Sequence, residues 1–185
     1  MTAASSARGS QTYVLERLGR MLAEDRTKDL DKALKILDSA KKIFVYGVGR
    51  SGLVARAFAM RLVQLGLEVY FIGETITPIV EEGDAVLVVS NTGDTMSAVQ
   101  TANIARRVGA KVVSVTGDPT AKLAHASNVV ICVREEHDAE RARLAPLGTL
   151  FEDASLILLD GLVAEVMEAL GESEATMRAR HAIMV

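Results

Sequence analysis

The sequence predicts an α/β fold, a three-layer α/β/α sandwich around a five-stranded parallel sheet. Five short runs rich in β-branched residues alternate with stretches of helical periodicity. The runs are apolar along most of their length rather than alternately polar, which is typical of strands that are covered on both faces. Alternation of strand and helix further indicates right-handed crossovers between parallel strands.

The predicted strands and helices follow one another in a regular order. The strands are expected at residues 42–46, 68–72, 85–89, 111–115 and 128–132. The helices between them are expected at residues 52–65, 96–108 and 121–126, and residues 78–83 are too few to assign. Gly66 and Gly109 each follow a helix and precede a strand, where a residue in the left-handed conformation commonly ends a helix.

Further helices flank this central alternation. From Tyr13 to Leu37 apolar residues recur at helical spacing, and the break at residues 25–28 indicates two helices or one kinked helix. Residues 151–170 form a helix that is apolar on most sides, so we expect it to be buried against more than one layer, with a second copy of the chain as the natural partner. Gly171 should end this helix, before a short one at 173–180.

The composition indicates a single domain over residues 1–185, with a flexible segment at 1–10, a helical segment at 11–40 and C-terminal helices at 149–185. The 21 Lys and Arg against 24 Asp and Glu give a net charge of −3, and only 4% of residues are aromatic. Neither value favours a nucleic-acid partner.

No segment reaches the roughly 18–20 apolar residues of a membrane span, and Met1–Ser10 lacks the apolar core of a signal peptide. We therefore expect a cytoplasmic protein without membrane attachment.

The single cysteine limits the covalent and metal chemistry of the chain. Cys132 has no partner for an intrachain disulfide, and one cysteine excludes cysteine-rich zinc and iron–sulfur sites. It stands in an apolar run, where we interpret it as a small core residue. We expect no metal site.

A glycine-rich loop follows the first predicted strand. Its sequence is Gly47-Val48-Gly49-Arg50-Ser51-Gly52, directly before a helix. Glycines allow a ligand to approach the backbone, and a helix N-terminus offers free N–H groups to a phosphate. The Ser51 hydroxyl adds a donor. The run also fits the G-x-G-x-x-G pattern of dinucleotide-binding proteins, with Glu68 or Glu74 as the ribose-binding acid, and a tight turn without a ligand is a further alternative.

A second loop rich in hydroxyl groups follows the third predicted strand. It reads Ser90-Asn91-Thr92-Gly93-Asp94-Thr95 and again precedes a helix. By itself it could simply cap that helix. In an open parallel sheet, however, ligands bind at the carboxyl ends of strands where the strand order reverses. Two such loops meeting there predict a site for one small phosphate ester, and the absence of a Walker lysine from both argues against hydrolysis of a nucleoside triphosphate.

The third candidate feature is a pair of carboxylates, Glu152 and Asp153, near the start of the long apolar helix. A carboxylate there favours the helix dipole, which is a purely structural role. The functional alternative is a general base whose pKa is raised by partial desolvation. Of the histidines, His125 and His137 are interpreted as structural or solvated. His181 lies in the C-terminal tail, where it is mobile or folds over the site of a neighbouring subunit.

The chain resembles the sugar isomerase (SIS) domain family over nearly its whole length after the first ten residues. The segments that carry the resemblance are Gly47–Ala55, Phe58–Leu62, Gly73–Thr75, Ser90–Thr95, Pro146–Glu152 and Arg180–Ala182. The resemblance implies a flavodoxin-like sandwich, usually tetrameric, that isomerises D-arabino-hex-3-ulose 6-phosphate to D-fructose 6-phosphate without a metal or nucleotide. That step belongs to formaldehyde fixation by the ribulose monophosphate pathway, so 3-hexulose-6-phosphate synthase is the pathway partner it suggests.

The resemblance also implies roles for particular residues. Ser51 and the loop of Ser90–Thr95 would hold the phosphate of the substrate. Glu152 would accept the proton in a reaction through a cis-enediol, assisted by His181 from its own or a neighbouring subunit. Apart from the resemblance, we expect Arg50 or Arg61 to offset negative charge on the phosphate or the enediolate, and a contact between subunits is the alternative role of Arg61.

The sequence departs from the family pattern in two places. The second loop commonly reads Ser-Gly-Ser-Gly-Glu-Thr, so Asn91 and Asp94 are expected to reshape the sugar end of the site. The tail after His181 lacks the expected amide and acid. The second departure concerns the role of the tail and not the fold.

Two other functions stay open beside the isomerase: another sugar-phosphate isomerase such as an arabinose 5-phosphate isomerase, and a non-catalytic module that binds sugar phosphates.

Overall fold

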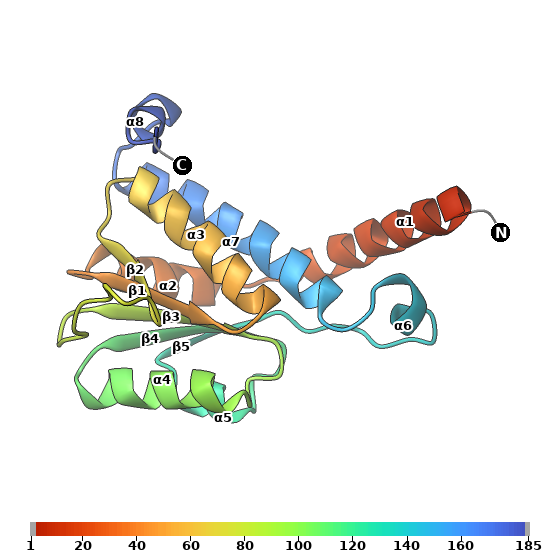
Figure 1. The fold of residues 1–185 in the computed structure, drawn as a ribbon, viewed down its shortest axis with the longest axis horizontal. Coiled ribbons are helices and arrows are strands. Elements are labelled where there is room, and N and C mark those ends of the chain that lie inside the picture. Colours follow the sequence, from red (N-terminus) through yellow and green to blue (C-terminus); the bar gives the residue numbers. More distant parts are fainter. Residues whose placement is uncertain (1–2, 184–185) are drawn as a thin grey trace.

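The computed structural model describes residues 3–183 and has the predicted three layers (Figure 1). One five-stranded sheet forms the middle layer in the order β2-β1-β3-β4-β5, and all its neighbouring strands pair in parallel. The expected fold class is therefore confirmed. The strands are β1 (Ile43–Gly47), β2 (Val69–Phe71), β3 (Ala85–Ser90), β4 (Lys111–Thr116) and β5 (Val129–Cys132).

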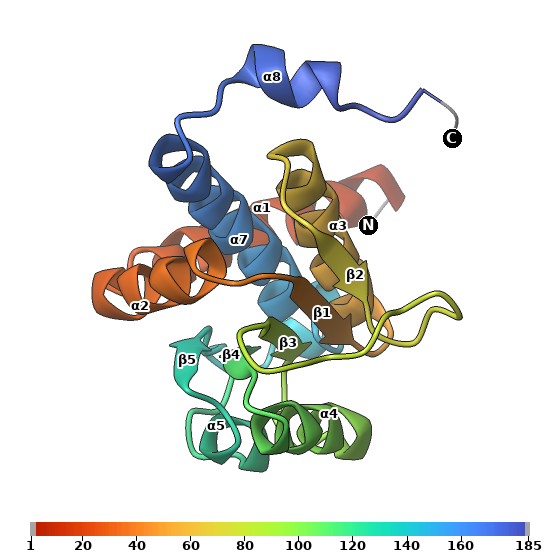
Figure 2. The same ribbon diagram turned by 90° about the vertical axis from the view of Figure 1, so that its left-hand side faces the viewer.

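Helices cover both faces of this sheet (Figure 2). One face carries α1 (Ala3–Leu22), α2 (Thr27–Asp38), α3 (Arg50–Gln64) and α7 (Thr149–Ala169), and the other carries α4 (Met96–Arg107) and α5 (Lys122–His125). Two short helices, α6 (Arg141–Leu144) and α8 (Glu174–Ala179), lie at opposite ends of the α3–α7 layer.

The strands divide their side chains between two hydrophobic cores, as expected for a sheet covered on both sides. Val45 and Leu87 pack under α3 and α7, whereas Phe44 and Val86 pack against α4. All four are completely buried. Successive side chains of a strand point to opposite faces, so an apolar run without alternation fills both cores at once.

The structure refines several boundaries. The break near residue 25 separates two helices, and α1 begins at Ala3, earlier than the expected start at residue 11. Residues 78–83 form neither helix nor strand, and α6 was not predicted. Gly66, Gly109 and Gly171 all have positive φ, between +66° and +90°, and each lies just beyond a helix, as predicted. Met184 and Val185 of the predicted tail lie outside the described residues.

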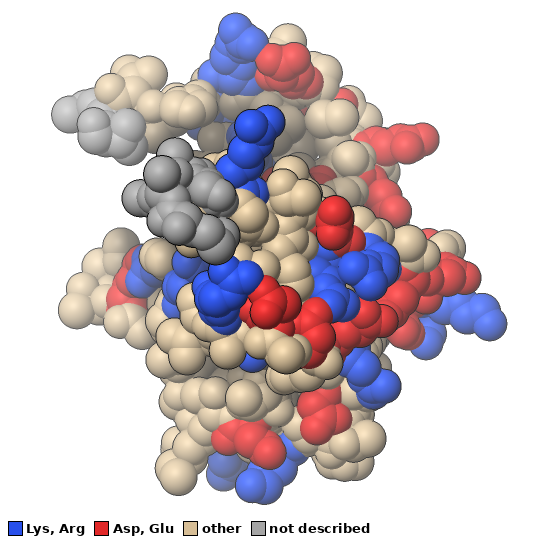
Figure 3. All heavy atoms as spheres, turned by 90° about the vertical axis from the view of Figure 1, so that its right-hand side faces the viewer, with Lys and Arg blue, Asp and Glu red and all other residues tan. Residues whose placement is uncertain are grey.

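The surface carries charges of both signs. On the face drawn in Figure 3, acidic and basic side chains are interleaved rather than gathered into a field of one sign. Among the described residues, no helix combines the length and the apolar character that crossing a membrane requires.

The sheet topology defines one edge where a ligand site is expected. From β1 the chain passes through α3 outward to β2, and then returns to β3 on the other side of β1. The strand order therefore reverses between β1 and β3, and the loops after these two strands diverge around a crevice at their carboxyl ends. Both loops predicted to bind phosphate lie there.

Candidate active site

The loop between β1 and α3 is shaped by its glycines. A Cβ at Gly47 would lie 2.8 Å from Gly52 N, and one at Gly52 would lie 2.6 Å from Gly47 O. These two glycines therefore let the start of α3 press against the end of β1. Gly49 has φ 59° and ψ −133°, a conformation that favours glycine, and nothing lies within 4 Å of where its Cβ would be. The loop is thus tight on the strand side and open above Gly49.

Ser51 and the N-terminus of α3 supply the donors of this loop. Ser51 is buried in the first turn, and Gly49 at the N-cap has no side chain to occupy the free N–H groups. The dinucleotide alternative fits less well. Glu68 precedes β2 and so lies at the other end of the strands from this loop, while Glu74 forms an ion pair with Arg56.

The loop between β3 and α4 carries hydroxyl groups that do not cap the helix. Thr95 occupies the N-cap position, yet its side chain makes no capping hydrogen bond. Ser90 Oγ donates to Thr95 Oγ1 over 3.3 Å, and Thr92 Oγ1 accepts from Asp94 N over 3.3 Å. The interpretation of this loop as a helix cap alone is therefore not supported.

Contacts with the end of β4 and the start of α5 fix the position of this second loop. Gly93 is buried with φ 65°, and a Cβ there would lie 2.6 Å from Ala121 Cβ and 2.8 Å from Thr116 Oγ1. Asp94 lies 3.8 Å from Lys122 Nζ. The backbone of the loop is thus pressed against the end of β4 and the start of α5.

Glu152 meets the first loop at the N-terminus of α7. Its carboxylate forms an ion pair with Arg50 Nε, and Arg50 also lies 3.3 Å from Asp153 Oδ1. The Glu152 side chain is only 12% exposed, against 59% for Arg50. The hydrogen bond to Glu152 raises the pKa of Arg50 above its usual value. A cavity of about 230 Å³ opens beside this pair, lined by Arg50, Leu53, Val54, Ala57, Glu152, Asp153 and Leu156.

Asn91 connects the second loop to the same helix end. A Cβ at Gly148, the N-cap of α7, would lie 3.1 Å from Glu152 Oε1 and 3.5 Å from Asn91 Nδ2. The Asn91 amide donates to Glu135 Oε1 over 3.3 Å. The two loops and Glu152 thus surround one region at the carboxyl edge of the sheet. A cavity of about 540 Å³ on the Asn91 side is lined by Asn91, Thr92, Gly117, Asp118, Arg134, Glu135, His137 and Arg141.

Glu135 was missed by the sequence reasoning, which took residues 134–143 as a charged loop. Its side chain is only 3% exposed, and it contacts the N-terminus of α7. Its position just after the last predicted strand, at the same sheet edge as the other loops, was the available signal.

His181 is not brought to this region within one chain. It is exposed and lines a cavity of about 580 Å³ with Arg61, Gln64, Met167, Glu174, Met177 and Arg178. Arg61 lies 11 residues after Arg50 on α3, about 16 Å along the helix axis. Figure 1 shows α8 at the far end of α3 and α7 from α6.

Arg180 fixes the segment that carries His181. Its guanidinium pairs with Glu172 at 2.8 Å and donates to Gln64 O over 3.2 Å. Hydrogen bonds from Arg180, the larger cause, and from Thr176 lower the pKa of Glu172 to about 2. This clamp holds α8 against the C-terminal end of α3.

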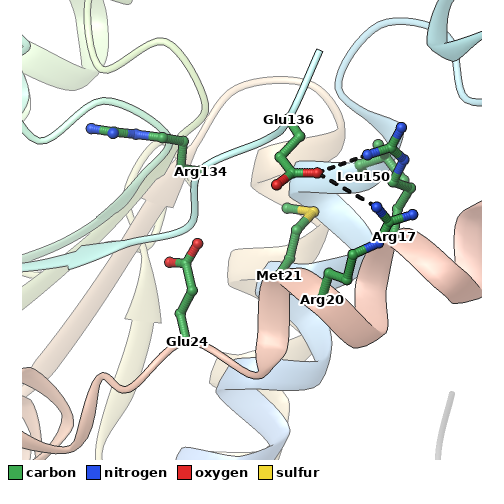
Figure 4. A pocket seen from close by; sticks show the side chains of 7 residues that line it. All are labelled: Arg17, Arg20, Met21, Glu24, Arg134, Glu136 and Leu150. Carbon is green, nitrogen blue, oxygen red and sulfur yellow. Dashed lines mark hydrogen bonds and ion pairs between the residues drawn. The ribbon is translucent and has the colours of Figure 1, made fainter. Parts of the chain in front are cut away.

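A small cavity beside α1 has a structural character (Figure 4). It measures about 30 Å³ and is lined by Arg17, Arg20, Met21, Glu24, Arg134, Glu136 and Leu150. In Figure 4, Glu136 points toward Arg17 and Arg20, at 2.8 and 3.8 Å. This volume suits a water molecule rather than a sugar phosphate. The ion pairs join α1 to the segment after β5.

The chain is thus an α/β protein with a doubly wound parallel sheet, and two hydroxyl-bearing loops lie at the switch point of that sheet. Residues 36–156 match the model of the SIS domain. The chain belongs to the SIS domain family.

Two relatives and a solved structure are similar to the chain over most of its length. The 3-hexulose-6-phosphate isomerase of Methanocaldococcus jannaschii is 34% identical over 165 residues, which cover 89% of each chain. A protein of Archaeoglobus fulgidus is 44% identical over 155 residues, covering 82% of this chain and 85% of its own. A crystal structure of a Methanococcus jannaschii protein, for which a molecular function of 3-hexulose-6-phosphate isomerase was inferred, superposes with a TM-score of 0.83 at 31% identity, covering 92% of this chain and 98% of that one.

Proposed function

We propose that this protein is an isomerase that converts D-arabino-hex-3-ulose 6-phosphate to D-fructose 6-phosphate. The observation that carries the proposal is the mostly buried Glu152 carboxylate, which meets Arg50 of the first loop at the sheet's switch point. A base held beside a phosphate site is what an isomerisation of a sugar phosphate requires. The similarity to 3-hexulose-6-phosphate isomerases supports the choice of substrate.

The two loops bind the substrate's phosphate in this mechanism. Ser51 and the hydroxyls of Ser90, Thr92 and Thr95 donate hydrogen bonds, and the N-termini of α3 and α4 add backbone N–H groups and positive dipole ends. Gly49 and Gly93 supply the turns, while Asn91 and Asp94 face the sugar. Binding energy from the phosphate, which does not react, positions the carbon atoms near the base.

Glu152 then transfers one proton between two neighbouring carbons. Its carboxylate removes the proton from C2 of the 3-keto sugar, the C2–C3 double bond forms, and the oxygen at C3 takes up a proton. The resulting cis-enediol loses the proton of its C2 hydroxyl, and C3 receives the proton that Glu152 returns. The carbonyl group has thereby moved from C3 to C2 without any change in redox state.

Arg50 serves both the base and the charged intermediate. In the structure its guanidinium is ion-paired with the Glu152 carboxylate. Because 59% of the Arg50 side chain is exposed, the guanidinium is free to turn toward the phosphate or the enediolate once substrate is bound. No metal or nucleotide takes part in this scheme.

The proposal extends to the assembly of the protein. Within one chain His181 lies at the opposite end of α3 from Glu152, so we place it in the site of a neighbouring subunit, where it would assist proton transfer at the oxygen atoms. Exposed apolar side chains on α3 and α7, among them Leu53, Met60 and Ile157, supply a surface for that neighbour. We propose a homotetramer of single-domain chains that acts in the cytoplasm, with 3-hexulose-6-phosphate synthase as its pathway partner.

The test is an assay with enzymatically generated hexulose 6-phosphate, in which fructose 6-phosphate formation is coupled to reduction of NADP. Arabinose 5-phosphate is assayed in parallel. Conversion of the hexulose phosphate alone supports the proposal. Turnover of arabinose 5-phosphate alone would establish the alternative isomerase, and binding of sugar phosphates without turnover of either would establish a non-catalytic module.

Two neighbouring variants test the base. Glu152→Gln removes the proton acceptor while keeping the shape of the side chain, so turnover should be lost and fructose 6-phosphate should still bind. Asp153→Asn makes the same change of charge at the next residue and should keep turnover within a few-fold. Normal turnover by Glu152→Gln would refute the role of Glu152.

A further inference from the structure

Glu135 is a buried carboxylate that joins three separate segments of the candidate site. It lies three residues beyond β5, and its side chain is only 3% exposed. Its Oε1 accepts hydrogen bonds from Phe151 N over 2.9 Å and from Asn91 Nδ2 over 3.3 Å, and its Oε2 accepts from Arg141 Nε over 2.8 Å. The three donors belong to the start of α7, the second loop and the start of α6.

The bond to Phe151 fixes the start of α7. The first N–H groups of a helix have no partner within the helix, and Gly148 at the N-cap has no side chain to accept from them. Glu135 supplies that acceptor from a distant part of the chain, and its negative charge suits the positive end of the helix dipole. Phe151 directly precedes Glu152, so the same bond holds the peptide unit between Leu150 and Phe151, one unit before the one that leads into Glu152.

The other two bonds extend this fixation to both sides of the site. Asn91 belongs to the second loop, so one carboxylate oxygen holds that loop and α7 at a set separation. Arg141 also donates to Leu147 O, which anchors the turn before Gly148. A buried carboxylate with charged and neutral donors on its oxygens cannot shift without leaving a group unpaired.

We propose that Glu135 is a positioning residue, which sets the distance between the base Glu152 and the loop of Ser90–Thr95. This inference rests on the proposed function, because it assigns Glu135 an effect on the same reaction. Proton transfer depends steeply on geometry, and a misplacement of about 1 Å costs roughly 100-fold in rate. Loosening Glu135 should therefore lower kcat much more than it weakens binding of the sugar phosphate.

Glu135→Gln tests this inference, with Glu136→Gln as its matched control. The glutamine amide would still accept a hydrogen bond through its oxygen. Its NH2 group, however, cannot accept, so at least one of the donors that now bond to the Glu135 carboxylate would lose its acceptor. Glu136 is the next residue, 67% exposed, and pairs with Arg17 on α1 rather than with α7. We expect kcat of Glu135→Gln to fall about 10- to 100-fold with the affinity for fructose 6-phosphate within about threefold, and Glu136→Gln to behave as the wild type.

Hydrogen–deuterium exchange gives a second readout that needs no substrate. Exchange at residues 148–152 should speed up in Glu135→Gln and stay unchanged in Glu136→Gln. Unchanged kcat and unchanged exchange in Glu135→Gln, or equal losses in both variants, would overturn the inference. If Glu135→Gln does not fold, Arg141→Lys is the variant to test. Lysine keeps the positive charge but cannot bond to Glu135 and Leu147 O at the same time, as the guanidinium does. A lowered kcat in this variant supports the inference, and an unchanged kcat overturns it. Absence of hexulose phosphate turnover in the wild type would refute the proposed function alone, because the exchange comparison still tests Glu135.

Discussion

A single added methyl group at Gly148 should disturb the base without disturbing the fold. Alanine at this position would place Cβ 3.1 Å from Glu152 Oε1, 3.2 Å from Glu152 Cδ and 3.5 Å from Asn91 Nδ2. Gly148 has φ −91° and ψ 16°, which alanine also adopts, so backbone strain contributes little. The effect should therefore come from the contact with the carboxylate.

The size of the effect follows from that distance. The Glu152 carboxylate must give way by a few tenths of an ångström to reach an ordinary contact. If a misplacement of about 1 Å costs roughly 100-fold in rate, a third of that displacement costs about fivefold, or about 1 kcal/mol in the activation free energy. Alanine is also a poorer N-cap than glycine, by up to about 1 kcal/mol. That would lower Tm by about 2–4 °C in a chain of this size.

The assay measures kcat and KM with hexulose 6-phosphate and Tm on the same preparations. Gly161→Ala is the control, because Gly161 lies in the same helix and nothing lies within 4 Å of its Cβ position. That variant should gain about 1 kcal/mol of stability from helix propensity and keep its kcat. A folded Gly148→Ala protein with the kcat of the wild type would refute the reasoning, as would an equal loss in Gly161→Ala.

Three further predictions concern the phosphate site, the C-terminal clamp and the thiol. Ser51→Ala should raise KM while kcat changes little, because Ser51 is assigned to the phosphate and not to the reacting carbons; an unchanged KM would place the phosphate elsewhere. Since Arg180 holds the pKa of Glu172 at about 2, below its usual 4.5, the clamp stabilises α8 above about pH 4.5 and loses that contribution as the pH falls toward 2. Protection of the α8 amides, taken as their exchange rate relative to that of an unfolded peptide at the same pH, should therefore fall over that range. Arg180→Ala should weaken this dependence, leaving the smaller part due to the Thr176 hydrogen bond. Burial raises the pKa of the Cys132 thiol, so alkylation by iodoacetamide at about pH 8 should be slower than for a free cysteine, and an equal rate would show an exposed thiolate.

Local sequence patterns were sufficient for the layers of this fold. The predicted strands at 42–46 and 85–89 differ by one residue at most at each end from β1 and β3, because an apolar β-branched run between turn residues specifies a buried parallel strand by itself. Gly66 and Gly109 were assigned correctly for a similar reason. The positive φ that ends a helix depends only on the few residues around that end, so the local sequence predicts it. The start of α1 was placed too late because its first turns are small and polar, without the apolar periodicity that marks a helix.

The sequence by itself thus determined the α/β class, the two loops at the carboxyl ends of strands and Glu152 at a helix start. Only the tertiary structure decided how these parts face one another. It paired Glu152 with Arg50, which are 102 residues apart, and buried Glu135 against Phe151 and Asn91. It also placed His181 at the far end of α3. These contacts depend on where the crossovers bring distant segments together. The periodicity of a sequence reflects only residues that are close along the chain, so it cannot predict such contacts.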